Sequence, residues 1–427
     1  MPISGLGPYM GKRKNRVCGA DVHKDIIVAT IQDSDDTEFQ EKFGTTSIEL
    51  GRFRDWLIAH NCEQVAFEAT GVYWFPVYDA LSPSIDTIVA NPWMIKGIPR
   101  NKSDTLDSKW IAGNCLDGKI KRSRVLPKDG RDLRTLTRAR SAYTKTRTQL
   151  RNRIHKYLAL CGITLSSYIS DIFGKSGRHI LDGLIESKDI DTIMDGIPSG
   201  KVKNKREPIK ASLGNGLDDV SRMLIKDTLE LLDHLDEKVS DTSLEILGRL
   251  QERARDLAIV MSVPGIGFVS ASIILAEIGD YHDFQKSEQL VKWCGLAPGL
   301  NESAGKKSPC GITKQGSKHL RTILVEIAQV VAKMSKNNLS SFFHRLRARK
   351  NYNVAITALA RKLISIIFHL LINQELYQED NCDTVKTKPI KKDLLCLSKE
   401  EQFKDGVAAI VDAFYYFKKK SSLEGGG

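Results

Sequence analysis

Four acidic residues near the start of the chain have the spacing of a metal-dependent site that cleaves phosphodiesters. Asp21 ends one short apolar run, Glu68 ends a second, and Asp104 and Asp107 share one helical turn. Carboxylates brought together from two strand ends and a helix can hold two divalent cations about 4 Å apart, as in polymerases and nucleases. The Asp104 pair alone also fits a helix cap, because acidic residues are favoured at helix starts. The four residues together favour the metal site.

The overall charge is typical of a protein that binds nucleic acid. The chain has 427 residues, a formal net charge of +12 and a pI of about 9.2. Its length is sufficient for more than one domain. A basic surface can also serve solubility alone, because net charge bears on non-specific binding and not on fold. We interpret the charge as an attraction for phosphate backbones.

Other features of the composition exclude several classes of protein. The eight cysteines are scattered without a Cys-x-x-Cys pair, so neither a zinc ribbon nor a disulfide framework is expected. The N-terminus lacks the apolar core of a signal peptide, and the longest apolar stretch, 363–371, is too short to span a bilayer. We therefore expect a cytoplasmic protein without a membrane partner. Residues 423–427 resemble the remnant of an expression tag and are excluded from the fold prediction.

Residues 16–128 are expected to form an α/β domain. Apolar, β-branched runs predict strands at 16–20, 26–31, 64–68 and 87–90. Helical patterns follow at 47–60, 72–81 and 104–116. The first two runs are close enough for a hairpin, and helices separate the later ones, which indicates a mixed sheet with helices on its faces. A ribonuclease-H-like (RNase H-like) sheet has this order and places acidic residues at strand ends.

The segment 129–258 is expected to form long helices. Apolar residues between 133 and 158 approximate one helical stripe, and nine Lys or Arg lie between 131 and 156 against a single acid, Asp132. Since a solvated helix normally mixes charges of both signs, this excess predicts a face that contacts phosphates. The residues that we assign to nucleic-acid binding there are Arg134, Arg138, Lys145, Arg147, Arg151 and Arg153.

Two patterns within this segment predict its further organisation. Residues 199–213 are basic and contain Pro and Gly, which predicts a loop. Residues 217–258 show heptad spacing, but Asp236 and Ser243 interrupt the apolar d positions. The heptads fit a long core helix and a coiled-coil arm for self-association equally well.

Two parts of the mostly helical region 259–372 are expected to contact phosphates. Pro264-Gly-Ile-Gly267 is typical of a helix-hairpin-helix segment, in which Gly265 and Gly267 let the backbone approach a phosphate, although an ordinary tight turn fits as well. The second part is a Gly-rich loop that contains Ser303. Because no histidine adjoins Ser303 to activate it, the residues alone favour a phosphate-binding loop over a nucleophile. The cations expected to bind phosphates there are Lys306, Lys307, Lys314, Lys318 and Arg321.

Ordered motifs along the chain resemble the IS110 family of DEDD transposases, in particular its IS1111 subgroup. The N-terminal motifs are Asp21-Val-His-Lys24, Phe67-Glu-Ala-Thr-Gly71, Asn91-Pro92 and Lys102-Ser-Asp-Thr-Leu-Asp107. The C-terminal motifs are Pro264-Gly-Ile-Gly267, Gly295-Leu-Ala-Pro298, Ser303-Ala-Gly305 and Gly311-Ile-Thr-Lys-Gln-Gly316. The family more often has Ser-Gly-Gly or Ser-Ser-Gly where this chain has Ser303-Ala-Gly305, so the serine loop departs slightly from the pattern.

The resemblance implies a division of labour along the chain. After an N-terminal extension at 1–15 it implies a RuvC-like catalytic domain at 16–128, linking helices and a coiled-coil arm at 129–258, a C-terminal transposase domain at 259–372 and a tail at 373–427. It further implies that Asp21, Glu68, Asp104 and Asp107 bind Mg²⁺ and that Ser303 joins covalently to a DNA end. The partners would be donor and target DNA, a structured guide RNA and further copies of the chain, which would share a composite active site.

Three functions are therefore compatible with the sequence. The first is an RNA-guided transposase or recombinase that cleaves and rejoins strands through phosphoserine. The second is a RuvC-like junction nuclease that hydrolyses DNA, with Ser303 in a structural role. The third is a non-catalytic helix-hairpin-helix protein that binds nucleic acid and whose acidic residues serve as caps and ion-pair partners.

Overall fold

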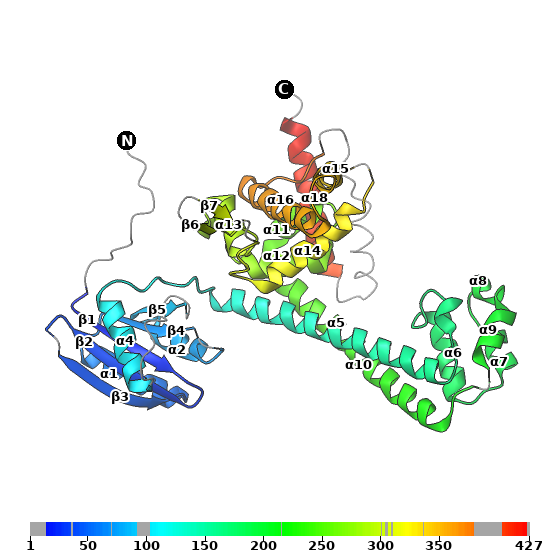
Figure 1. Cartoon of the computed structure of the whole chain (residues 1–427), viewed down its shortest axis with the longest axis horizontal. Coiled ribbons are helices and arrows are strands. Elements are labelled where there is room, and N and C mark those ends of the chain that lie inside the picture. The colour runs from blue at the N-terminus through cyan, green and yellow to red at the C-terminus, as the bar shows by residue number, and fades with distance from the viewer. Residues whose placement is uncertain are drawn as a thin grey trace. The chain divides into compact units, whose positions relative to one another are not determined.

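The chain folds into two compact units, residues 1–126 and 127–427 (Figure 1). The computed structural model describes residues 14–91 except 36 and 70, 103–379 except 215, 300, 304, 305, 309, 310 and 336, and 404–424. The predicted N-terminal extension, up to residue 13, lies outside the described residues, as does Pro92. The segments predicted at 129–258 and 259–372 both lie in the second unit.

A five-stranded mixed sheet forms the centre of the first unit. Its strands are β1 (Arg16–Val22), β2 (Ile26–Asp33), β3 (Glu38–Gly44), β4 (Gln64–Glu68) and β5 (Asp86–Ala90), in the order β3-β2-β1-β4-β5. The first three strands pair antiparallel, and β4 and β5 run parallel to β1. The predicted α/β fold with an RNase H-like strand order is confirmed. The sequence reading missed β3 because this edge strand exposes polar side chains instead of an apolar run.

Helices cover both faces of this sheet. Helices α1 (Ser47–Ala59) and α2 (Trp74–Leu81) pack against one face, where Cys18, Ala20 and Phe67 are buried. Helix α4 (Asp104–Leu116) packs against the other face, on Val17 and Ala66. Because side chains alternate along a strand, Asp21 and Glu68 lie on the α4 side of β1 and β4.

Two long antiparallel helices form an arm in the second unit (Figure 1). They are α5 (Lys128–Leu160) and α10 (Asp219–Arg249). The predicted heptad residues of α10 are buried, and α5 of the same chain covers them. The two polar d positions are also paired across this seam: Asp236 accepts a bond from Arg147 over 2.6 Å, and Ser243 accepts one from Arg140 over 2.7 Å.

The far end of the arm carries four short helices. They are α6 (Lys175–Ile185), α7 (Ile190–Asp195), α8 (Gly200–Lys203) and α9 (Arg206–Leu213). The prediction of a loop at 199–213 was therefore wrong. Pro208 lies in the first turn of α9, where a missing N–H costs no helical hydrogen bond, and Ile209 and Leu213 are buried in the local core.

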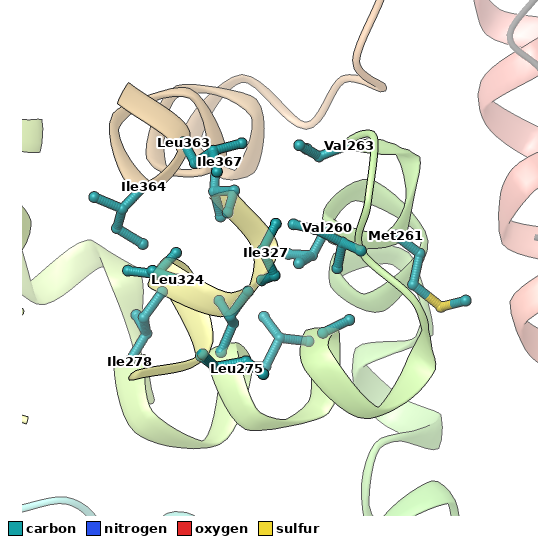
Figure 2. Close-up of a cluster of buried hydrophobic side chains, with 14 of the residues drawn as sticks. Val260, Met261, Val263, Leu275, Ile278, Leu324, Ile327, Leu363, Ile364 and Ile367 are labelled. Carbon is teal, nitrogen blue, oxygen red and sulfur yellow. The ribbon is translucent and has the colours of Figure 1, made fainter. Parts of the chain in front are cut away.

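A helical body closes the other end of the second unit. Its helices are α11 (Ala254–Ser262), α12 (Phe268–Ile278), α13 (Ser287–Trp293), α14 (Lys318–Ala332), α15 (Asn338–Arg347), α16 (Tyr352–Asn373) and α18 (Lys404–Glu424), with short 3-10 turns at Gln251–Arg253 and Tyr281–Asp283. A further 3-10 turn, Leu165–Ser167, lies at the far end of the arm. Figure 2 shows aliphatic side chains of α11, α12, α14 and α16 converging in its core, among them Val260, Leu275, Ile327 and Leu363.

Two helices of this body differ from what their sequences suggest. Helix α16 is long and apolar enough to cross a membrane, but more than half of it is buried among α11, α13, α14 and α15, as expected of a core helix. Helix α18 lies in the predicted tail, yet Ile410, Phe414 and Phe417 pack into the core beside α11. This part of the tail, for which no fold was predicted from the sequence, therefore belongs to the helical body.

Candidate active site

Helix α4 lies directly on strand β1 because Gly19 has no side chain. A Cβ atom at Gly19 would lie 2.2 Å from the carbonyl oxygen of Ser108 and 2.2 Å from the amide nitrogen of Ala112. A second contact joins α4 to the neighbouring strand β2, because the buried hydroxyl oxygens of Thr30 and Ser108 are 2.7 Å apart and share a hydrogen bond. This close packing brings the first turn of α4 to Asp21, two residues beyond Gly19 and near the end of β1.

Three candidate ligand side chains meet at that point. Nε2 of His23 lies 3.1 Å from Oδ2 of Asp21 and 3.6 Å from Oδ1 of Asp104, and one ligand atom from each residue lies within 4.8 Å of the others. Asp21 is half-buried at the end of β1, whereas the other two side chains are exposed. The structure thus brings together Asp21 and Asp104, as predicted, with His23 between them.

The sequence reading did not single out His23 as a site residue. It follows Asp21 by two residues at the turn from β1 to β2, where its amide donates to Ile26 O over 2.9 Å. Residues two apart in an extended chain point to the same side, so this spacing was the available signal.

The pKa of the Asp21 carboxyl is raised by its surroundings, which include two other acidic residues. Burial raises the pKa of Asp21, and the charges of Asp104 and Asp107 raise it further, while His23 opposes the shift by its charge and its hydrogen bond. A carboxylate in this state gains from any bound cation, because a cation removes the repulsion and stabilises the ionised form.

Glu68 and Asp107 flank the cluster of three. Parallel pairing of β1 and β4 sets Ala20 opposite Phe67, so Asp21 and Glu68 are the next residues along two neighbouring strands. Asp107 follows Asp104 by one turn of α4 and is half-buried. The cap of α4 is Ser103, whose hydroxyl accepts from the Leu106 amide over 3.3 Å. Asp104 is therefore not the cap residue.

In the second unit Ser303 lies on a small β-hairpin and not in an irregular loop. Strands β6 (Asn301–Ser303) and β7 (Lys306–Ser308) pair antiparallel, with Ser303 opposite Lys306. Backbone bonds close the base of the hairpin, including Gly299 N to Gly311 O over 2.7 Å and Thr313 N to Ala297 O over 2.9 Å. The side chains of Ser303, Lys306 and Lys307 lie outside the described part of the chain.

Two of the arginines predicted to contact nucleic acid have a partner within the protein. Glu277 of α12 is buried, and Arg138 donates to it from Nε over 2.8 Å and from Nη2 over 3.1 Å. Arg134 donates to the Glu277 carbonyl over 2.8 Å and pairs with its carboxylate. These contacts fasten α5 to the helical body, and a further contact of Arg134 and Arg138 with nucleic acid stays a prediction.

Of the four other α5 residues predicted to bind nucleic acid, two contact side chains of the protein and two are exposed without an ion pair in the described part of the chain. Arg147 pairs with Asp236, and the guanidinium carbon of Arg151 lies 4.9 Å from the centre of the Phe173 ring. Lys145 and Arg153 are exposed and form no ion pair among the described residues. Lys145 and Arg153, like the exposed Lys156 on the same helix, therefore keep solvent-facing charge that can bind phosphate.

Gly265 and Arg321, two further residues predicted to contact phosphates, make contacts within the protein. Gly265 has φ +81° and faces Val331 of α14, so the alternative of a tight turn between packed helices accounts for this glycine; Gly267 caps α12 and is half-buried. Arg321 donates to the carbonyls of Cys294 and Lys314, each over 3.2 Å, and so braces the hairpin base instead of facing solvent. Lys314 and Lys318 are exposed.

Comparisons with known proteins place both sites in matched segments. A model of DEDD transposases of the IS110 type, described as "Transposase", matches residues 18–162, which contain the acidic cluster. A model described as "Transposase IS116/IS110/IS902 family" matches residues 257–344, which contain the Ser303 hairpin.

Relatives match most of the chain. The transposase for insertion sequence element IS1111A of Coxiella burnetii is 25% identical over 369 residues, which are 85% of this chain and 91% of that protein. A probable family 20 transposase of Pseudomonas aeruginosa is 24% identical over 383 residues, 88% of this chain and 99% of that protein. The transposase for insertion sequence element IS1328 of Yersinia enterocolitica is 30% identical over 138 residues, 31% of this chain and 40% of that protein.

Proposed function

The chain belongs to the IS110/IS116/IS902 family of transposases, and from this membership we propose that it excises and inserts its mobile element by joining Ser303 covalently to a DNA end. The observation that carries the proposal is the meeting of Asp21, His23 and Asp104 at the end of β1. Such a cluster serves phosphoryl transfer in a DEDD domain, whose acids hold divalent metal.

The donor atoms of the cluster suit a hard divalent cation such as Mg²⁺. Mg²⁺ prefers carboxylate oxygens, which Asp21 and Asp104 supply, with Glu68 and Asp107 beside them. A cation bound there would supply positive charge that balances the charge on the transferring phosphate. His23 orients Asp21 by its 3.1 Å contact and holds the carboxylates of Asp21 and Asp104 on one side of the site.

Ser303 is the proposed nucleophile. Its oxygen would form a bond to phosphorus as the bond from phosphorus to a deoxyribose oxygen breaks, and that oxygen would take up a proton while the serine hydroxyl loses one. One phosphoester replaces another, so the reverse attack can rejoin strands without ATP. Residues of the β6–β7 hairpin support this role because Lys306, opposite Ser303 in register, brings a cation to the same turn.

A structured guide RNA is the proposed source of sequence choice. The exposed cations Lys145 and Arg153 on α5 offer a surface for a phosphate backbone, and base pairing with donor and target DNA would read the sequence. Sequencing the RNA that copurifies with the protein tests this part. A defined transcript from the flank of the element is expected, and bulk cellular RNA alone would contradict it.

Trapping a covalent adduct tests the chemistry. The protein is incubated with donor DNA and Mg²⁺ and quenched in denaturant, and a protein–DNA adduct is expected for the wild type and for the control Ser308→Ala, but not for Ser303→Ala. Free nicked ends without any adduct would favour the hydrolytic nuclease. DNA binding that survives without cleavage in the wild type would favour the non-catalytic protein.

Asp104→Asn tests the acidic cluster in the same assay. This substitution at the start of α4 is expected to abolish both nicking and adduct formation, whereas Asp117→Asn at the end of the same helix leaves both intact. If the two sites come from different subunits, mixing Ser303→Ala with Asp104→Asn protein restores part of the activity. Absence of restored activity in a mixture shown to form mixed oligomers would contradict a shared site.

A further inference from the structure

A long acid-free segment runs through the helical body from residue 327 to residue 374. It contains no Asp or Glu, and its Lys and Arg are Lys333, Lys336, Arg345, Arg347, Arg349, Lys350, Arg361 and Lys362. Several arginines elsewhere in this unit do pair with acids: Arg178 pairs with Asp182 and Asp233, and Arg206 with Asp191 and Asp195. The positive charge of this segment is thus uncompensated within it.

Much of this charge gathers at one corner of the fold. Arg345 and Arg347 lie in the last turn of α15, and Arg349 and Lys350 lie in the turn that leads to α16; all four are exposed. Among the described residues Arg345, Arg349 and Lys350 form no ion pair. We call Arg345, Arg349 and Lys350 the corner patch.

The helix dipole explains only part of this patch. Cations in the last turn of a helix are favoured by the partial negative charge of its carbonyls, which accounts for Arg345 and Arg347. Arg347 has a further local role, because its Nη1 donates to the Lys350 carbonyl over 3.2 Å. Arg349 and Lys350 lie beyond the helix, where the dipole effect has faded, so their charge needs another explanation.

Hydrogen bonds and aromatic packing fix the backbone of the turn that carries the corner patch. The amides of Arg349 and Lys350 both donate to the Leu346 carbonyl, over 3.0 and 2.9 Å. Asn351 then caps α16 by accepting from the Val354 amide over 2.9 Å. Below the turn, the rings of Phe343 and Tyr352 meet edge to face with centroids 5.8 Å apart. Binding at such a turn requires ordering of the exposed side chains but not of the backbone.

We propose that the corner patch binds the sugar–phosphate backbone of duplex DNA outside the reacting segment. Guanidinium and ammonium groups without acidic partners bind phosphates and release counterions. Duplex DNA is favoured over a single strand because a single-strand site stacks successive bases on several aromatic rings, and Tyr352 offers one partly exposed ring that already contacts Phe343. Arg345, Arg349 and Lys350 lie beyond residue 344, where the C-terminal family match ends.

This inference rests on the proposed function only for the choice of DNA as the ligand. It does not depend on the chemistry proposed for Ser303. Binding is therefore measured in EDTA, with a DNA duplex that lacks the ends of the element. The triple variant Arg345→Gln/Arg349→Gln/Lys350→Gln is compared with the wild type over a series of salt concentrations. Neutralising three phosphate contacts is expected to make the plot of log affinity against log salt shallower by about 2–3 and to weaken binding at least tenfold at about 0.1 M salt.

Three comparisons decide the outcome. Arg345→Lys/Arg349→Lys keeps the charge and is expected to keep the wild-type slope, and Lys175→Gln/Lys203→Gln on α6 and α8 removes exposed charge elsewhere and is expected to change little. An unchanged slope in the triple variant, or an equal loss in the α6 and α8 control, overturns the proposal. A loss seen with structured RNA but not with duplex DNA also overturns it. Adduct formation by Ser303 is measured in a separate assay. If no adduct forms there, the DNA-binding result for the corner patch can still be interpreted.

Discussion

Arg138 on α5 donates two hydrogen bonds to the buried carboxylate of Glu277 on α12, over 2.8 and 3.1 Å. The hydroxyl of Ser317 donates to the same carboxylate over 2.8 Å and, by accepting from the Leu320 amide, caps α14. The amide of Ser317 donates to Trp293 O, next to the base of the Ser303 hairpin. One buried acid therefore connects the long arm with the segment that presents the proposed nucleophile.

Glu277→Gln is expected to lower the stability of the second unit. The substitution leaves Arg138 and Arg134 facing a neutral amide, and the loss of a charged hydrogen-bond partner costs about 1.5–3 kcal/mol. Urea unfolding followed by circular dichroism measures the change. The control Glu326→Gln removes an exposed acid of α14 and is expected to have almost no effect; an equal loss in both variants would contradict a special role of Glu277.

The same residue predicts a pH dependence. Burial raises the pKa of Glu277, but the hydrogen bond from Arg138, the charges of Arg134 and Arg138 and the Ser317 hydroxyl outweigh burial and leave the pKa below its usual value. A depressed pKa contributes stability that is fully present above the pKa of the unfolded chain, about 4.3, and is lost as pH falls through the folded value. The urea midpoint of the wild type should fall more steeply below pH 4 than that of Glu277→Gln, and parallel curves would refute this assignment.

Asp21→Asn is expected to stabilise the metal-free protein. Because the pKa of Asp21 is raised by burial and by neighbouring acids, stability is lost as pH rises through that pKa, and the amide avoids the loss. In EDTA at neutral pH the variant should melt above the wild type, and Mg²⁺ should raise the melting temperature of the wild type only. Asp25→Asn, in the exposed turn after β1, is the matched control and should behave as the wild type.

His23→Ala is expected to weaken metal binding more at pH 8 than at pH 6. At pH 8 a neutral imidazole can donate a lone pair to a cation held by Asp21 and Asp104. At pH 6 a protonated imidazole lowers the pKa of Asp21 by its charge, but the same charge repels a metal cation, so its removal costs less. Calorimetric titration with Mn²⁺ at both pH values measures the change, and a larger loss at pH 6 would contradict a ligand role for His23.

Arg147→Met combined with Asp236→Leu is expected to raise the melting temperature. Both side chains are partly exposed, so their ion pair contributes less than about 1 kcal/mol, whereas an apolar pair would complete the heptad seam of α5 and α10. Either single substitution should be neutral or mildly destabilising. Thermal melts of the singles and the double provide the measurement, and a double variant less stable than both singles would contradict the interpretation.

The sheet, the acids and the long helices could be predicted because each rests on local pattern. Apolar runs at 17–20, 26–31 and 64–68 specify strands, and an acid directly after such a run is placed at the edge of the sheet by chain geometry alone. Strand β3 and helices α8 and α9 could not be predicted in the same way. Their polar composition hides the few contacts, such as those of Ile209 and Leu213, that hold them.

The roles of individual basic residues depended on contacts that composition cannot express. Arg138 and Lys145 belong to the same basic helix, yet Glu277, which lies 139 residues further along the chain from Arg138, engages one and not the other. Arg321 likewise turned inward to brace two carbonyls. Charge density predicted a basic surface but not which cations face solvent.

By itself the sequence determined the kind of protein: a basic chain with strand-end acids, a serine in a Gly-rich segment and the ordered motifs of a transposase family, because these depend on residue type and local spacing. Only the tertiary structure decided that α4 rests on Gly19, that His23 stands between Asp21 and Asp104, and that Glu277 binds Arg134 and Arg138. These are contacts between residues distant in the chain. Their existence depends on which side chains packing brings within a few ångströms of each other, and no local pattern records that.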